Sequence, residues 1–149
     1  MVRALDHYSS TVNRCSASGD WAPYADLFTE DVVYYEHGYG IMNGREEVRE
    51  WIVKVMEPFP HMRFPHSWVA FDEANGAMVM EIRNMLDHPT EPGKEFWFPN
   101  FTRIVYAGDN LFSSEEDIYN PHRDAPGAVL AWMEAGGVML AEPIPMKHA

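Results

Sequence analysis

The chain has 149 residues, of which 46 % are hydrophobic and 13 % aromatic, and its formal net charge is −12. This composition is typical of a globular protein, the length fits one domain over residues 1–149, and the acidic balance argues against nucleic-acid partners and against binding to anionic membranes. The single cysteine, the polar N-terminus and the lack of any run of ~18 apolar residues favour a cytoplasmic protein without disulfides or membrane spans.

Hydrophobic spacing predicts the elements in chain order. It predicts a first helix over residues 5–15, a short second helix over 21–28, a strand over 32–36 and a third helix over 48–56. The remaining pattern predicts four strands, over 67–72, 77–87, 95–106 and 111–119, followed by a helix over 125–135. We expect the proline-interrupted tail over 138–149 to pack on the surface or on a second subunit.

Helices grouped on one side of an antiparallel sheet define an α+β fold. We therefore expect a cone-shaped, curved antiparallel sheet that packs against three N-terminal helices, with a C-terminal helix after it. A curved sheet closed by helices encloses a cavity, which is a common place for a small ligand.

The predicted strands carry a few polar residues on otherwise apolar rows. Alternate side chains of a strand share a face, so Glu36 lies in one row with Val32 and Tyr34, and Glu116 lies in one row with Phe112. If these rows face the concave side of the sheet, four polar side chains converge on one pocket: Glu36, Asn84, Asn100 and Glu116. We expect a small hydrophobic substrate to be contacted there by Tyr8, Tyr34, Trp51, Asn84 and Phe98.

Burial would make these residues suitable for acid–base catalysis. A carboxyl group in an apolar cavity has a raised pKa, which makes it a useful general acid or base near neutral pH. Glu36 or Glu116 would act as the base, while Asn84 and Asn100 would orient a carbonyl group or stabilise an enolate oxygen. The alternative is that both acids are solvated at strand ends and that both asparagines make only structural hydrogen bonds.

Other chemistries have weaker support in the sequence. His37 titrates near pH 7, but strand alternation points it away from Glu36, so we expect a secondary proton carrier or a turn residue. The sequence has neither a His-Glu-x-x-His motif nor a cysteine pair, and it has no glycine-rich phosphate loop. We therefore expect no metal and no cofactor. Cys15 lies on the apolar stripe of the first helix and is expected to be inert.

Three stretches resemble a known family. They are the Gly-Asp-Trp at 19–21 followed by Leu-Phe-x-Glu-Asp-Val-Val at 27–33, the Gly-Arg-Glu-Glu-Val-Arg at 44–49, and the segment over 106–121 that resembles a closing hairpin. Together they resemble the SnoaL-like group of the nuclear transport factor 2-like superfamily over residues from about 5 to 121. The family includes polyketide cyclases, ketosteroid isomerases, epoxide hydrolases, dehydratases and non-catalytic binding domains, so the resemblance implies the fold more specifically than the reaction.

The resemblance also implies roles for single residues. Glu36 falls where a ketosteroid isomerase carries its catalytic base, and Asn100 falls where that enzyme carries a proton-donating aspartic acid. The first-helix tyrosine of the isomerase is absent, with Tyr8 one turn earlier. SnoaL-like cyclases place an acid on a late strand, a position that Glu116 or Asp117 would fill.

The leading hypothesis is a cofactor-independent acid–base enzyme, an isomerase, cyclase or dehydratase acting on a small hydrophobic carbonyl compound. A non-catalytic domain that binds a small molecule or a partner is the first alternative. An epoxide hydrolase is the second, although the arginines of the two middle strands lie opposite the asparagine rows. Large residues on the convex face of the sheet, Trp97, Phe101 and Tyr119, predict a homodimer.

Overall fold

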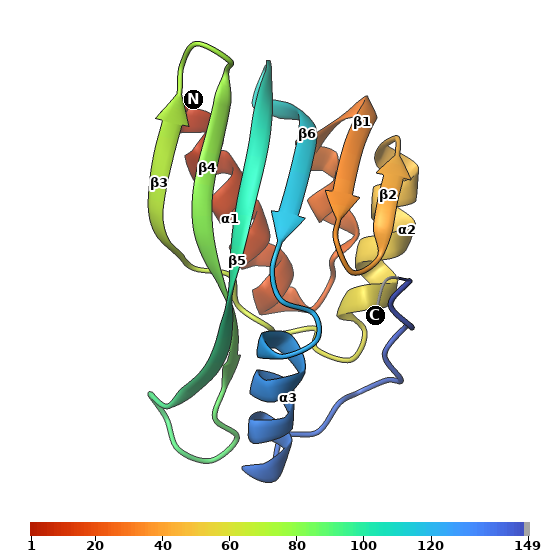
Figure 1. The fold of residues 1–149 in the computed structure, drawn as a ribbon, viewed down its shortest axis with the longest axis vertical. Coiled ribbons are helices and arrows are strands. Elements are labelled where there is room, and N and C mark those ends of the chain that lie inside the picture. The colour runs from red at the N-terminus through yellow and green to blue at the C-terminus, as the bar shows by residue number, and fades with distance from the viewer. Residues whose placement is uncertain (148–149) are drawn as a thin grey trace.

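The computed structural model describes residues 1–147 and contains one sheet with three α-helices and one 3₁₀ helix (Figure 1). In chain order the elements are α1 (Val2–Ser18), η1 (Ala22–Leu27), β1 (Phe28–Glu36), β2 (Gly40–Asn43), α2 (Arg45–Met56), β3 (His66–Asp72), β4 (Ala77–Asp87), β5 (Glu95–Gly108), β6 (Leu111–Ile118) and α3 (Asp124–Glu134). Within residues 1–147, no helix is both long and apolar enough to cross a membrane.

The sheet has six strands in the order β2-β1-β6-β5-β4-β3, and the predicted α+β class is confirmed. Every pair of neighbouring strands is antiparallel except β1 and β6, which run parallel. The parallel pair arises because β1 and β6 are far apart in the chain. After β1 the chain passes through β2, α2 and the β3–β5 meander before β6 pairs with β1. The sequence reading missed β2, since four residues are too few to show an alternating pattern.

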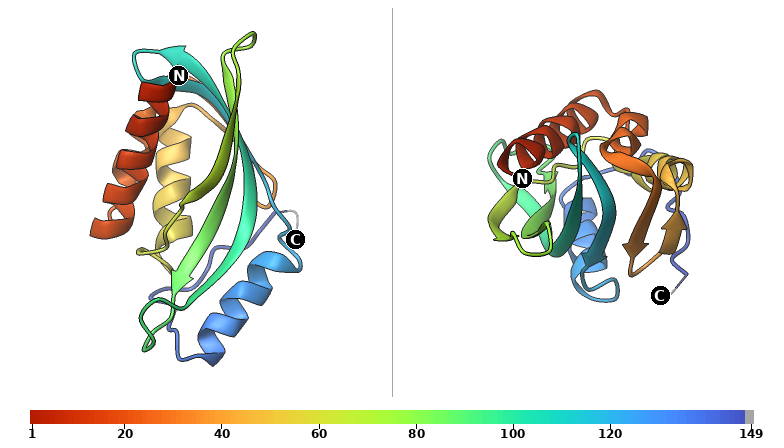
Figure 2. Two further views of the ribbon diagram at one scale, coloured as in Figure 1. Left: turned by 90° about the vertical axis from the view of Figure 1, so that its left-hand side faces the viewer. Right: turned by 90° about the horizontal axis from the view of Figure 1, so that it is seen from above.

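Helices α1 and α2 cover one face of the sheet, and α3 lies beside the far ends of β4 and β5 (Figure 2). The predicted apolar stripe of α1 is buried against the sheet, with Cys15 only 1 % exposed. The predicted second helix is a 3₁₀ helix with Pro23 in its first turn, and it begins where Asp20 Oδ1 accepts a hydrogen bond from the amide of Ala22 at 3.1 Å.

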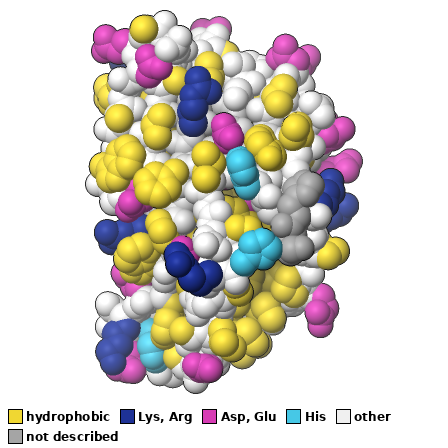
Figure 3. Space-filling view, viewed as in Figure 1, with side chains coloured by type: hydrophobic (Ala, Val, Ile, Leu, Met, Phe, Trp, Pro, Cys, Tyr) yellow, Lys and Arg dark blue, Asp and Glu magenta, His cyan; other side chains and the backbone are white. Residues whose placement is uncertain are grey.

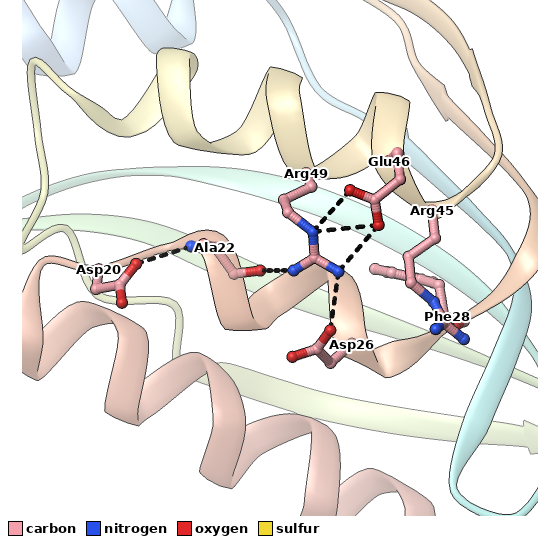
Figure 4. Close-up of polar contacts among 7 residues, drawn as sticks. All are labelled: Asp20, Ala22, Asp26, Phe28, Arg45, Glu46 and Arg49. Carbon is pink, nitrogen blue, oxygen red and sulfur yellow. Dashed lines mark hydrogen bonds and ion pairs between the residues drawn. The ribbon is translucent and has the colours of Figure 1, made fainter.

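Two arginines of α2 hold η1 and the start of β1 in place (Figure 4). Arg49 donates to the carbonyl oxygen of Ala22 at 2.5 Å and forms an ion pair with Asp26 at 2.9 Å. Arg45 Nε donates to the carbonyl oxygen of Phe28 at 2.8 Å. The Gly-Arg-Glu-Glu-Val-Arg motif therefore fixes the position of the aromatic η1 segment against the sheet, which is a structural role.

A β-bulge changes the course of β6. Val105 of β5 pairs with Ser114, whereas the next residue, Tyr106, pairs with Phe112. Ser113 is thus an extra residue that opposes nothing on β5. Because side chains alternate along a strand, one inserted residue reverses which side chains of β6 face inward beyond this point.

The C-terminal segment, residues 138–147, is hydrogen-bonded to two earlier parts of the chain. The amide of Leu140 donates to the carbonyl oxygen of Pro58 at 3.1 Å, and the amide of Lys147 donates to that of Gly38 at 2.9 Å. These bonds join the segment to the end of α2 and to the turn after β1. The part of the predicted tail at 148–149 lies outside the described residues.

Candidate functional site

A cavity of about 560 Å³ lies between the concave face of the sheet, α1, η1, α2, α3 and the C-terminal segment. This volume is in the range of small-molecule sites. The structure brings seven of the predicted site residues to its wall: Tyr8, Tyr34, Glu36, Trp51, Asn84, Phe98 and Asn100. Their placement agrees with the strand alternation of β1, β4 and β5, and their roles remain predictions.

The two other predicted residues, Glu116 and His37, do not line the cavity. Their side chains are about one-third exposed, and His37 Nε2 lies 3.0 Å from Glu116 Oε1. The expectation that Glu116 shares the inner face is wrong, because the bulge at Ser113 turns Glu116 outward. His37 points away from Glu36 as strand alternation predicts, and its ring stacks on Tyr35 with centroids 4.1 Å apart.

The bulge turns Glu115 and Asp117 into the cavity instead, and both are buried, at 1 % and 7 % exposure. Glu115 Oε1 accepts hydrogen bonds from the hydroxyls of Tyr8 at 2.9 Å and Tyr24 at 3.0 Å, and the hydroxyl oxygen of Tyr34 lies 3.2 Å away. The tyrosines come from α1, η1 and β1 respectively, so three separate elements converge on one carboxyl group. The sequence reading considered Asp117 only through the resemblance and did not consider Glu115 or Tyr24.

Asp117 is held by a second set of donors. Tyr34 donates to Oδ2 at 2.5 Å, while Thr102 and Asn100 donate to Oδ1 at 2.5 and 2.9 Å. Nδ2 of Asn100 also lies 3.2 Å from Thr102 Oγ1. The amide of Asn100 therefore helps to hold Asp117, and its expected donation to a substrate oxygen stays a prediction.

Burial raises the pKa of both inner acids of β6. Desolvation raises the pKa of Glu115 well above its ordinary value, and the neighbouring Asp117 charge raises it further. Desolvation also raises the pKa of Asp117, although its donors Thr102, Tyr34 and Asn100 favour the ionised form. The donors around Asp117 thus favour its ionised form, whereas burial and the neighbouring charge favour the protonated form of Glu115.

Glu36 lies beside this pair, because its Cα is paired with that of Asp117 across β1 and β6. It is 4 % exposed, and Oε2 accepts a hydrogen bond from the amide of Tyr39 at 2.5 Å. Desolvation raises the pKa of Glu36, against the hydrogen bond from the Tyr119 hydroxyl that lowers it. Tyr119 was expected on the convex face, but it lines the cavity together with Glu115 and Asp117, because the bulge at Ser113 reverses the alternation of side chains.

Several buried polar atoms in the cavity wall have no hydrogen-bond partner within residues 1–147: the indole Nε1 of Trp51, Oδ1 of Asn100 and Oε2 of Glu115. Trp51 packs near Tyr34 and Tyr39, with ring centroids 5.1 and 6.1 Å away, and so brings a free N–H donor to the Glu36 side of the cavity. The other two atoms belong to the Glu115–Asp117 side, where Asn100 Oδ1 is an acceptor and Glu115 Oε2 carries the proton when Glu115 is neutral. A native structure rarely leaves such atoms unsatisfied without a reason.

The lining residues include three carboxyl groups, Glu36, Glu115 and Asp117, but no lysine, arginine or histidine from the part of the chain that the structure describes. Arg83, on the other face of β4, lies over the Trp97 ring with its Cζ 4.5 Å from the centroid. No group of three or more histidine, cysteine or acidic side chains within residues 1–147 is arranged to hold a metal ion. The polar chemistry at hand is proton transfer between carboxyl, phenol and ligand groups.

Gly38 provides a test of the Glu36 environment. A Cβ at this position would lie 2.7 Å from the Tyr119 hydroxyl and 3.2 Å from Glu36 Oε2, whereas its backbone suits any residue. We expect Gly38→Ala to displace both side chains and to lower ligand affinity or turnover about tenfold, with a loss of ~1–3 kcal/mol in the free energy of unfolding. Calorimetry and urea unfolding would measure the two effects.

Gly127→Ala is the matched control for this substitution. Gly127 lies within α3, and a Cβ there meets no atom within 4 Å. Alanine favours a helix over glycine by about 0.5–1 kcal/mol, so this variant should be slightly more stable and unchanged in function. Unaltered function in Gly38→Ala would contradict the close packing described for Glu36 and Tyr119.

Comparisons with known proteins identify the family. A family model described as SnoaL-like domain matches residues 9–111, which is more than half of the chain. The chain therefore belongs to the family of SnoaL-like domains. Among curated proteins, no sequence matches this chain.

Solved structures show the same fold at low sequence identity. An NTF2-like protein from Anabaena variabilis ATCC 29413 is 16 % identical and has a TM-score of 0.63, with 83 % of this chain and 91 % of that chain covered. A hypothetical protein with a ketosteroid isomerase-like fold from Catenulispora acidiphila DSM 44928, in complex with trimethylamine, is 17 % identical, with a TM-score of 0.64 and coverages of 82 % and 92 %. An LEH-like epoxide hydrolase from M. tuberculosis is 14 % identical, with a TM-score of 0.62 and coverages of 89 % and 91 %.

Proposed function

We propose that the chain is a cofactor-independent acid–base enzyme that acts on a small hydrophobic carbonyl compound, as an isomerase, cyclase or dehydratase. The observation that carries the proposal is the set of buried carboxyl groups in one largely apolar cavity, each with a raised pKa. Groups of this kind exchange protons near neutral pH, which is the requirement for general acid–base catalysis.

In this proposal Glu36 is the base. Its pKa is raised by burial, and it lies on the side of the cavity where Trp51 offers an unpartnered N–H. A substrate carbonyl oxygen that accepts from Trp51 Nε1, and from the amide of Asn84, would place its neighbouring C–H toward Glu36. The donors would then stabilise the enolate that forms when the proton leaves.

Proton abstraction has a direct readout. The protein is incubated in D₂O with a panel of hydrophobic ketones and enones, and deuterium incorporation next to the carbonyl is followed by mass spectrometry. The proposal expects exchange well above the uncatalysed rate for at least one compound. Exchange at the uncatalysed rate across the whole panel, with binding shown for some members, would instead support the non-catalytic binding domain.

The binding domain is the second candidate because the Catenulispora protein of the same fold holds a small molecule, trimethylamine. The likeness to an epoxide hydrolase is one of fold, at 14 % identity. No arginine within residues 1–147 lines the cavity, so the acid–arginine–acid cluster expected of that chemistry has no counterpart there. A cytoplasmic location stays a prediction based on the single cysteine.

We also propose a homodimer that forms through the outer face of the sheet. Figure 3 shows apolar side chains gathered on this face, over β3, β4 and β5. Trp68, Trp97, Phe101 and Ile118 are each more than 40 % exposed, an unusual set for the surface of a monomer. Arg103 and Glu116 pair across β5 and β6 on the same face, and a two-fold axis would allow such opposite charges to meet.

We expect Phe101→Glu to raise the dimer dissociation constant at least about tenfold, because it would bury two negative charges at the interface. Analytical ultracentrifugation over a concentration series measures this constant. Val2→Glu is the control, since Val2 is also exposed but starts α1 on the other side of the sheet. A wild-type protein that sediments as a monomer, or a Phe101→Glu variant that dimerises normally, would refute the interface.

A further inference from the structure

The Glu115–Asp117 side of the cavity holds a buried hydrogen-bond acceptor that the protein leaves without a donor. Oδ1 of Asn100 has no hydrogen-bond partner within residues 1–147. Asn100 is 6 % exposed, and it lines the cavity next to Asp117, which is 7 % exposed. A buried acceptor without a donor is unfavourable, so a ligand that brings N–H donors to this side would satisfy what the protein leaves open.

The charges in the cavity wall also favour a ligand of this kind. Three carboxyl groups lie in its wall, yet no basic side chain of residues 1–147 lines it. An ionised carboxylate in a water-poor site is stable only with a partner of opposite charge or with full hydrogen bonding. The protein supplies hydroxyl and amide donors to Asp117, but no basic side chain of residues 1–147 faces it from the cavity wall, so a cationic ligand would supply the charge partner on that side.

Aromatic rings surround these acids. Besides Trp51 and the three tyrosines around Glu115, the wall includes Phe98 and Tyr119, whose ring centroids lie 5.7 Å apart. The faces of aromatic rings attract ammonium groups, and their apolar area suits the body of a hydrophobic ligand. Acceptors, negative charge and rings together therefore match one kind of ligand.

We propose that the substrate or ligand is a protonated amine on an apolar body, with its ammonium group seated against Asp117 and Asn100. This inference rests on the proposed function and names the substrate class of the same site. Because Glu36 is paired with Asp117 across β1 and β6, the ammonium group would lie one strand away from the proposed base. The reacting carbon would then lie only a few bonds from the nitrogen.

The test compares three ligands of one shape by titration calorimetry on the intact protein at neutral pH. N,N-dimethylphenethylamine carries a positive charge, isopentylbenzene is its neutral hydrocarbon counterpart, and benzylacetone is a neutral ketone of similar size. We expect the amine to bind at least about tenfold more tightly than both neutral compounds. Equal or tighter binding of either neutral compound, or no binding of the amine at millimolar concentration, would overturn the proposal.

Variants assign the interaction to its residues. Asp117→Asn keeps the size of the side chain but removes its charge, so it should lower amine affinity at least about tenfold and leave benzylacetone affinity unchanged. Glu116→Gln removes the charge of the adjacent residue on β6, which lies on the outer face of the sheet, and should change neither affinity. An equal loss for amine and ketone in Asp117→Asn would contradict the charge-based contact. The wild-type comparison decides the question even if this variant does not fold.

The inference and the proposed function can fail separately. Tight amine binding together with no deuterium exchange on any carbonyl compound would refute the proposed enzyme activity and support the amine site. Deuterium exchange on neutral ketones together with weak amine binding would support the proposed enzyme activity and refute the amine site.

Discussion

Glu36→Gln is expected to lower turnover about 10²-fold or more, which is the usual effect of removing a general base. The amide has nearly the same shape as the carboxylate but cannot take a proton. Because Glu36 is buried and accepts the Tyr39 amide at 2.5 Å, a glutamine can keep this hydrogen bond through its own oxygen. The fold should therefore survive, and ligand affinity should change less than turnover. Steady-state kinetics and deuterium exchange measure the effect.

Glu116→Gln is the matched comparison, because it makes the same chemical change on the neighbouring strand but outside the cavity. The sequence alone predicts a loss in this variant comparable to that of Glu36→Gln, since it places both acids in one pocket. The structure instead places Glu116 beside His37, so turnover should stay close to wild type. Full activity in Glu36→Gln would refute its role as the base.

The pH dependence gives a second check on Glu36. Desolvation raises its pKa above the ordinary value, and a base works only when it is ionised. Turnover should therefore fall as the pH drops through this raised pKa, at a higher pH than an exposed glutamate would give. The acidic limb of the profile should vanish in Glu36→Gln, together with most of the activity.

Glu115→Gln is expected to make the protein more stable, by an amount that grows with pH. The pKa of Glu115 is raised in the folded state, mainly by desolvation, so the folded chain binds more protons than the unfolded chain above the ordinary pKa of 4.5. The free energy of unfolding then decreases as pH rises from that value up to the raised pKa, by about 1.4 kcal/mol per pH unit for one group. A glutamine does not titrate, so the free energy of unfolding of the variant does not decrease in this way.

Urea unfolding of wild type and Glu115→Gln between pH 5 and pH 8 tests this result. The two stability curves should diverge as the pH rises, with the wild type lower. Glu116→Gln is the comparison, because it makes the same chemical change outside the cavity, at a side chain that is about one-third exposed. Parallel curves for Glu115→Gln would show that Glu115 is not buried in its folded environment as described.

The elements and much of the cavity wall are readable from the sequence. Regular alternation over residues 32–36 of β1 and along β4 and β5 places Glu36, Asn84 and Asn100 inward, because an uninterrupted stretch of strand has a strict period of two. The same reasoning fails on β6. There the row of Phe112, Ser114, Glu116 and Ile118 has an apolar residue at each end and suggests the inner face, whereas the polar row of Glu115 and Asp117 suggests the outer one.

What the amino-acid sequence by itself determined is the SnoaL-like family, the α+β class and the inward position of Glu36, since each depends on local spacing. The tertiary structure alone decided which acids of β6 join Glu36. A single unpaired residue, Ser113, reverses the alternation, and backbone pairing with β5 rather than any side-chain pattern selects where that residue lies. It also decided that Tyr8, Tyr24 and Tyr34, from three separate elements, meet at Glu115, because only the packing of α1 and η1 against the sheet brings their hydroxyls together.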